Sequence, residues 1–175
     1  GIKGLGSEAS TVTDSSVSAS DLNTLNTSTD YNITVNATAI SGSLSDVSTL
    51  YGNKAADSDA DTDGFTGLGN EAITLTDTGS IAASTLLTVA QANSSGTVDA
   101  SNAGTITGTA EQIIDAYDDS TITEASDVAL TVNTANSGTA TLTQARSLDD
   151  LTTGVVTATI AATDLSDLLD NSTPV

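Results

Sequence analysis

The stretch DSDADTDGF, residues 57–65, carries four closely spaced carboxylates that could bind a metal ion. Carboxylates stand at every second position, at Asp57, Asp59, Asp61 and Asp63, and a glycine follows directly. Counted from Asp59, acids occupy the first, third and fifth positions of a loop with glycine at the sixth. An EF-hand loop uses this spacing to bring alternate side chains onto one calcium ion. The stretch therefore indicates a calcium site.

The match to an EF-hand ends after that glycine. The twelfth position is Asn70, and the nearest glutamate, Glu71, comes one place later. The intervening GFTGLG is a poor helix former, whereas an EF-hand has a helix on each side of its loop. Two interpretations stay open: a calcium loop outside an EF-hand, completed by backbone carbonyls, and a solvated acidic loop. Calcium is the one cofactor predicted, and its candidate ligands are Asp57, Asp59, Asp61, Asp63 and Glu71.

The composition argues against most other chemistry. The 175 residues include no Cys, His, Met or Trp. Zinc, copper, iron–sulfur and haem sites therefore lose their usual ligands, and Ser–His or Cys–His nucleophilic groups are absent. Paired carboxylates could hydrolyse glycosides, but a sugar cleft is usually lined with aromatic side chains, and the chain has four aromatics. We expect a protein that is not an enzyme and has no catalytic residues.

The charge of the chain limits its partners. It has 23 acidic residues and only three basic ones, Lys3, Lys54 and Arg146, which gives a formal net charge of −20. Such a surface repels nucleic acid and anionic membranes, and the apolar runs are too short to span a bilayer. We expect no nucleic-acid partner and no membrane insertion. Because the chain begins at Gly1, we expect either an internal piece of a longer protein or a mature chain without its targeting segment.

The sequence repeats itself. The stretches that begin at Gly1 and Gly64 share GLG, an acid at Glu8 and Glu71, a short threonine-rich strand and a helix-like segment. A third copy begins near Thr121, where TEASDVALTV replaces GLGNEAITLT. We therefore predict one elongated repeat domain over residues 1–175, with repeats 1–63, 64–120 and 121–175.

Each repeat divides into two half-units, and each half-unit is predicted to be a short strand followed by a short helix. The predicted strands centre on Val12, Val35, Leu75, Val98, Val132 and Val156. Each predicted helix carries two apolar residues three positions apart: Leu22/Leu25, Val47/Leu50, Leu86/Val89, Ile114/Tyr117, Leu148/Leu151 and Leu165/Leu168. Capping boxes are predicted at Ser18–Asp21, Ser43–Asp46, Thr109–Gln112 and Thr141–Gln144.

These helices are too short to be stable alone in water, so each must pack on its neighbours, as in a solenoid. Successive strands would then join one parallel sheet through right-handed crossovers. The predicted fold class is a right-handed α/β repeat solenoid of short parallel strands stacked with short helices. The alternative is an all-β helix or sandwich in which the short helices are turns.

The motifs GLGNEAITLTD, GTVDASNAGTITGTAEQIIDAY and SASDLNTLNTST resemble the repeats of long, acidic surface or secreted proteins of marine cyanobacteria, and of virion fibres of their phages. The resemblance covers essentially the whole chain and is closest over Gly64–Tyr117. It implies an extracellular, structural or adhesive role with no catalytic residue. Strong acidity also suits seawater, where salt screens the repulsion between surface carboxylates.

The function expected from these observations is a non-enzymatic structural segment of an extracellular surface protein, fibre or filament, in which calcium would rigidify the loop Asp57–Gly64. Its partners would be neighbouring repeats, or copies of itself packed end to end. The alternative is an adhesin or phage-fibre module that binds a cell-surface ligand. A concave patch that gathers Tyr31, Tyr51 or Tyr117 would favour this alternative, because ligand binding usually needs an aromatic anchor.

Overall fold

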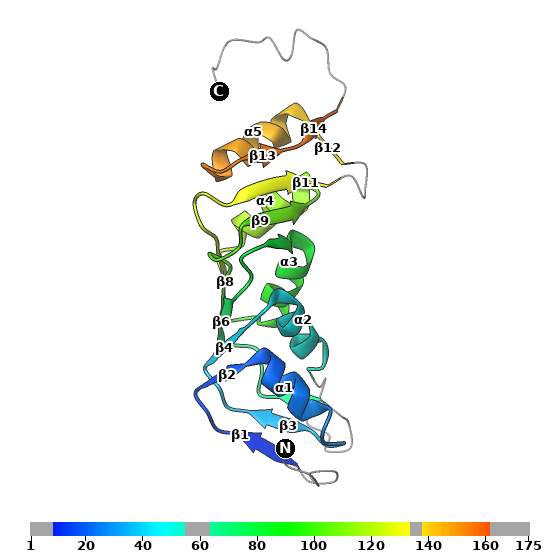
Figure 1. Cartoon of the computed structure of the whole chain (residues 1–175), viewed down its shortest axis with the longest axis vertical. Coiled ribbons are helices and arrows are strands. Elements are labelled where there is room, and N and C mark those ends of the chain that lie inside the picture. Colours follow the sequence, from blue (N-terminus) through cyan, green and yellow to red (C-terminus); the bar gives the residue numbers. More distant parts are fainter. Residues whose placement is uncertain (1–8, 55–63, 134–137, 162–175) are drawn as a thin grey trace.

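A computed structural model describes residues 9–54, 64–133 and 138–161 (Figure 1). Over these residues the chain passes repeatedly through short strands and then a helix, and we call each passage a layer. Layer 1 contains β1 (Ser10–Val12), β2 (Ser16–Ser18) and α1 (Ala19–Asn26). Layer 2 contains β3 (Ile33–Val35), β4 (Ala39–Gly42) and α2 (Leu44–Gly52). Layer 3 contains β5 (Phe65–Thr66), β6 (Ala72–Leu75), β7 (Ser80–Ala82) and α3 (Ala83–Ala92).

The remaining layers follow the same plan. Layer 4 contains β8 (Thr97–Asp99), β9 (Thr105–Gly108) and α4 (Ala110–Asp118). Layer 5 contains β10 (Ile122–Thr123), β11 (Ala129–Val132), β12 (Thr139–Ala140) and α5 (Leu142–Leu151). Layer 6 contains β13 (Val156–Thr157) and β14 (Thr159–Ile160). The layers follow one another along the long axis of the molecule, from blue to orange in Figure 1.

The strands of successive layers pair in parallel. They form four sheets, with the orders β1-β3-β5, β2-β4-β6-β8-β10, β7-β9-β11-β13 and β12-β14. The registers align apolar residues from layer to layer, and the longest such column is Val17, Ile40, Ile73, Val98 and Ile122. The chain is thus α/β with parallel strands, as predicted. The prediction of one sheet was wrong, because β7 and β12 each start a new sheet.

Two sheets begin in layer 1, and one more begins in layer 3 and in layer 5. The strand before the helix belongs to the second sheet in layers 1 and 2, to the third sheet in layers 3 and 4, and to the fourth sheet in layer 5. Layers 3 and 5 each have three strands, whereas layers 1, 2, 4 and 6 have two. The structural unit that recurs among the described residues is therefore a pair of layers.

The five described helices pack against one another in sequence order, and the predicted caps begin four of them. The hydroxyls of Ser18 and Ser43 accept hydrogen bonds from the backbone N–H three residues on. Thr109 and Thr141 form reciprocal capping boxes with the glutamines three residues later. The helix α3 begins after Ala82 without a side-chain cap. These helices contradict the all-β alternative.

The core lies between the strands and the row of helices. All six predicted strand centres lie in strands, and the pairs Val47/Leu50 and Leu86/Val89 are buried. In α4 the pair Ile114/Tyr117 is half-buried and packs against the core, whereas Ile113 and Ala116 are fully buried. The pair Leu165/Leu168 lies outside the described residues. Among the described helices, none has the length and apolar character that crossing a membrane requires.

Candidate functional site

The most deeply buried polar side chains in the described part of the chain gather where layers 2, 3 and 4 meet. Glu71 and Asn93 have no exposed surface, and Tyr51 is 6 % exposed. Tyr51 belongs to the last turn of α2, Glu71 directly precedes β6, and Asn93 is the C-cap of α3. We call these three residues the buried polar cluster. It forms because stacking brings together positions that are far apart in the sequence.

One carboxylate oxygen of Glu71 accepts three hydrogen bonds. The Tyr51 hydroxyl donates to Oε2 at 2.5 Å, and the backbone N–H groups of Gly69 and Asn70 donate to the same oxygen at 2.8 and 3.1 Å. Burial, and then the neighbouring Glu71 carboxylate, raise the pKa of the Tyr51 hydroxyl well above its ordinary value. The hydroxyl therefore stays protonated and remains a donor. Hydrogen bonds of this kind, to a charged group, are stronger than those between neutral groups.

The Asn93 side chain forms two hydrogen bonds with the backbone of Glu71. Its Nδ2 donates to the Glu71 carbonyl at 2.9 Å, and its Oδ1 accepts from the Glu71 N–H at 3.2 Å. The same Oδ1 lies 2.9 Å from the Tyr51 hydroxyl, and Nδ2 also donates to the carbonyl of Thr97, at 3.4 Å. The buried polar cluster thus connects α2 with the strands β6 and β8. It fixes the layers relative to one another.

A second tyrosine occupies the equivalent place without the same partners. Tyr117 is the penultimate residue of α4, as Tyr51 is of α2. The residue directly before β11 is the buried Val128, in the place that Glu71 takes before β6. The Tyr117 hydroxyl is buried and has no hydrogen-bond partner among the described residues.

The acid whose charge acts on the Tyr117 hydroxyl is the half-buried Glu124. Burial, together with the charge of Glu124, raises the pKa of Tyr117 to about 12. Burial also raises the pKa of Glu124 to about 7; the charge of Asp119 adds to this effect and a backbone hydrogen bond opposes it. The pair is therefore two buried polar groups that the fold satisfies incompletely.

The predicted calcium ligands separate into two groups. Asp57, Asp59, Asp61 and Asp63 lie outside the described residues. Glu71 is described, and its Oε2 is bonded to the donors given above, whereas Oε1 is buried with no hydrogen-bond partner in the described part of the chain. Over residues 9–54, 64–133 and 138–161, no three acidic side chains lie close enough together to hold a metal ion. The calcium site stays a prediction.

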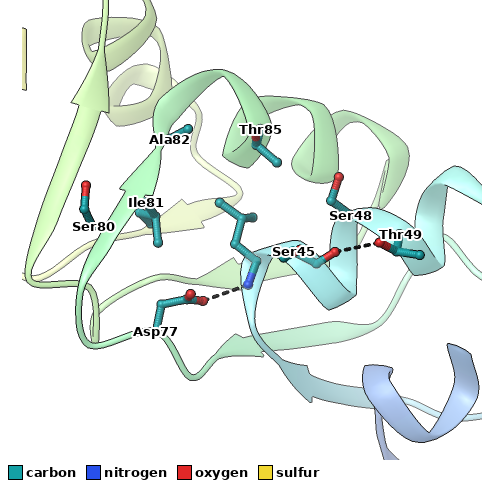
Figure 2. Close-up of a pocket in the computed structure, with 9 residues that line it drawn as sticks. Ser45, Ser48, Thr49, Asp77, Ser80, Ile81, Ala82 and Thr85 are labelled. Atoms are coloured by element: carbon teal, nitrogen blue, oxygen red, sulfur yellow. Dashed lines mark hydrogen bonds between the residues drawn. The ribbon is translucent and has the colours of Figure 1, made fainter. Parts of the chain in front are cut away.

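A surface groove of about 350 Å³ lies between α2 and α3 (Figure 2). Most of its lining is hydroxyl groups, with one carboxylate: Leu44, Ser45, Ser48, Thr49, Asp77, Ser80, Ile81, Ala82 and Thr85. Asp77 is bound within the fold, because it accepts a hydrogen bond of 2.7 Å from the backbone N–H of Leu44 at the start of α2. The groove can offer hydroxyl hydrogen bonds to a small polar molecule.

Two more grooves lie at the ends of the stack. The N-terminal groove, of about 300 Å³, is lined by Val12, Asp14, Ser16, Val17, Ser18, Asp21, Leu22 and Leu25. The C-terminal groove, of about 360 Å³, is lined by Leu142, Ala145, Arg146, Asp149, Val156, Ala158 and Ile160. No tyrosine lines any of these three grooves. They therefore lack the aromatic anchor expected of an adhesin.

Comparison with known proteins finds no family model, no curated protein and no solved structure that matches this chain. The functional interpretation therefore rests on the residues and their geometry alone.

Proposed function

We propose that the chain is a non-enzymatic structural segment of an extracellular surface protein, fibre or filament, built as a right-handed α/β solenoid. The observation that carries this proposal is the parallel pairing of strands from each layer to the next, from β1 through β14. A chain that adds layers in this way gains length without widening. Right-handed connections are the rule for parallel strands joined by a crossover.

The buried polar cluster supports a mechanical role. An elongated stack resists bending when its layers cannot slide past one another. The contacts of Tyr51, Glu71 and Asn93 cross from layer 2 into layers 3 and 4 and are lost if those layers shift. The net charge of −20 keeps such a segment soluble and discourages unspecific association.

Small-angle X-ray scattering tests the stacked architecture. A protein that carries two copies of residues 1–175 in tandem should have about twice the maximum dimension of a single copy, and the same cross-sectional radius. A compact particle, or a flexible pair of beads, would overturn the proposal of a rigid segment. The location is tested separately, with antibodies raised against the folded chain: they should label intact cells that make the protein. Labelling only after permeabilisation would refute an extracellular role.

The hydroxyl-lined groove between α2 and α3 suggests one second candidate, a module that binds a small neutral saccharide on a cell surface through hydroxyl hydrogen bonds alone, without an aromatic anchor. Ser48 and Thr85 line this groove from the two helices. Binding to a panel of neutral glycans that is lost in the variant Ser48→Ala/Thr85→Ala would support this candidate. Binding that survives this double substitution, or no binding to any glycan, would argue against it.

A further inference from the structure

The hydroxyl-lined groove between α2 and α3 also runs along the edge of a strand. Its lining includes three consecutive residues, Ser80, Ile81 and Ala82, which together form the whole of β7 (Figure 2). Successive side chains of a strand point to opposite faces, so a groove over one face of β7 would be lined by alternate residues. Because all three residues line the groove, we infer that it follows the edge of the strand.

This edge of β7 has no partner among the described strands. The strand β7 is the first of its sheet and pairs only with β9, which belongs to layer 4. In layer 2 the strand β4 pairs with β6, and the chain then enters α2 after the single residue Ser43. The groove therefore occupies the place where a strand of layer 2 would continue the sheet of β7.

The backbone groups on the free edge belong to Ser80 and Ala82. The Ile81 carbonyl faces β9, since it accepts a hydrogen bond of 3.1 Å from the Thr107 hydroxyl. Backbone groups of successive residues in a strand point to opposite edges, so the N–H and C=O of Ser80 and the N–H of Ala82 face away from β9. In the described structure none of these three groups bonds to the backbone of layer 2. The edge thus offers two donors and one acceptor to an added strand.

The charge of the groove limits what can occupy it. Asp77 is the one carboxylate in its lining, and no basic residue lines it. The whole chain carries a formal net charge of −20, so a second copy would be repelled. A neutral or basic occupant suits the groove better, because charges of opposite sign speed association and select partners.

We propose that this groove binds an extended peptide segment of a partner protein, which adds to β7 as an edge strand and carries a lysine or arginine toward Asp77. The peptide backbone would accept hydrogen bonds from the N–H groups of Ser80 and Ala82 and donate one to the Ser80 carbonyl. In strand addition, backbone hydrogen bonds give affinity and side-chain contacts give specificity. A saccharide would use the hydroxyl groups and leave the strand edge unpaired. This inference goes beyond the structural role proposed above and does not depend on where the protein is located.

Synthetic peptides test the inference by fluorescence polarisation. The probes are short peptides of alternating valine and threonine with a single lysine, because valine and threonine favour the extended conformation. The same peptides with glutamate in place of lysine are the control for charge. We expect the lysine peptides to bind, and the glutamate peptides to bind at least about ten times more weakly. No binding by any lysine peptide, or equal binding of both sets, would overturn the inference.

The variants Ser80→Pro and Ser80→Ala distinguish recognition of the backbone from recognition of the hydroxyl group. Proline removes the N–H that faces the groove and is tolerated on edge strands, whereas alanine removes only the hydroxyl. We expect Ser80→Pro to weaken binding of the lysine peptides at least about tenfold and Ser80→Ala to change it less than about twofold. Circular dichroism melts of both variants would show that each folds. Equal effects of the two substitutions on binding would overturn the inference.

Amide hydrogen exchange gives a second measurement, on the protein without any substitution. With a lysine peptide bound, the N–H groups of Ser80 and Ala82 should exchange at least about ten times more slowly, whereas the Ile81 N–H, already paired with β9, should keep its rate. Unchanged exchange at Ser80 and Ala82 would place the peptide elsewhere and overturn the inference. A rod-like tandem protein that binds no peptide would leave the structural role standing and reject only the peptide site. Glycan binding without peptide binding would assign the groove to the saccharide.

Discussion

The substitution Tyr51→Phe tests the buried polar cluster, and the chain supplies its own control in Tyr117→Phe. The two tyrosines are penultimate residues of equivalent helices, and each substitution removes a single hydroxyl group. The Tyr51 hydroxyl donates to Glu71 and also lies within hydrogen-bonding distance of Asn93, whereas the Tyr117 hydroxyl is buried with no partner in the described part of the chain. We expect the first substitution to destabilise the fold and the second to leave its stability nearly unchanged.

The magnitude follows from the partner of each hydroxyl. A hydrogen bond to a charged group contributes about 1.5–3 kcal/mol to stability. After Tyr51→Phe, Oε2 of the buried Glu71 keeps its two backbone donors and loses its shortest hydrogen bond, so we expect a loss of about 2 kcal/mol. A chain of this size loses about 2–4 °C in melting temperature per kcal/mol, which gives about 4–8 °C. Tyr117→Phe removes no hydrogen bond and should change stability by less than about 0.5 kcal/mol.

Thermal unfolding followed by circular dichroism at pH 7 measures both variants. A double-mutant cycle with Glu71→Gln then isolates the coupling between hydroxyl and carboxylate, which should reach at least about 0.5 kcal/mol for residues in contact. Equal melting temperatures for Tyr51→Phe and Tyr117→Phe would refute the reasoning, since the two would then differ in hydrogen bonding without differing in stability. Additive effects in the cycle would show that the Tyr51 hydroxyl is not coupled to the Glu71 carboxylate.

Three further predictions concern other parts of the chain. Because burial raises the pKa of Glu124 to about 7, above its ordinary 4.5, the folded state binds its proton more tightly and stability falls as the pH rises from about 4.5 through 7. Glu124→Gln should reduce the slope of melting temperature against pH in this range, and an unchanged slope would contradict the assignment. Millimolar calcium, compared with a chelator, should raise the melting temperature of the protein but not that of the variant Asp61→Ala. The reason is that an ion that binds only the folded state stabilises it. No shift in either protein would favour the interpretation of residues 57–63 as a solvated acidic loop. Thr109→Ala removes the capping box of α4 and should lower the free energy of unfolding, measured by denaturant titration, by about 1 kcal/mol. Substitution of the exposed Thr88 by Ala should lower it much less. Equal losses for the two variants would argue against the cap.

Local signals in the sequence predicted much of the fold. A capping residue acts on N–H groups within one turn, so Ser18, Ser43, Thr109 and Thr141 could be identified without knowledge of the tertiary structure. The strand centres were also visible, because an apolar residue between threonines has the period of a half-buried strand. Both signals depend on neighbours in the sequence.

The strands next to the helices were missed for the same reason. Segments such as SVS, SIA and TITG have three or four residues and run into the helix caps, so no alternation is long enough to reveal them. What makes them strands is the pairing with the previous and next layers. The sequence also leaves open which side of α4 is buried most deeply, because Ile113 and Ile114 are adjacent and only the contacts with neighbouring helices decide which is buried.

Glu71 shows what the tertiary structure adds to a candidate residue that its position in the sequence alone suggested. It is a candidate calcium ligand because it is the glutamate nearest to the aspartates, and in the structure its carboxylate is bonded in the interior to Tyr51, 20 residues earlier in the chain. In the sequence the acid recurs at Glu8 and Glu71 after the same GLG motif. In the third repeat Val128 takes this place, and there the equivalent tyrosine has a buried hydroxyl without a partner in the described structure. Since the acid and its hydrogen bond to tyrosine are lost together, Glu71 is best understood as a residue that holds layers 2 and 3 in register, and its part in a calcium site stays a prediction.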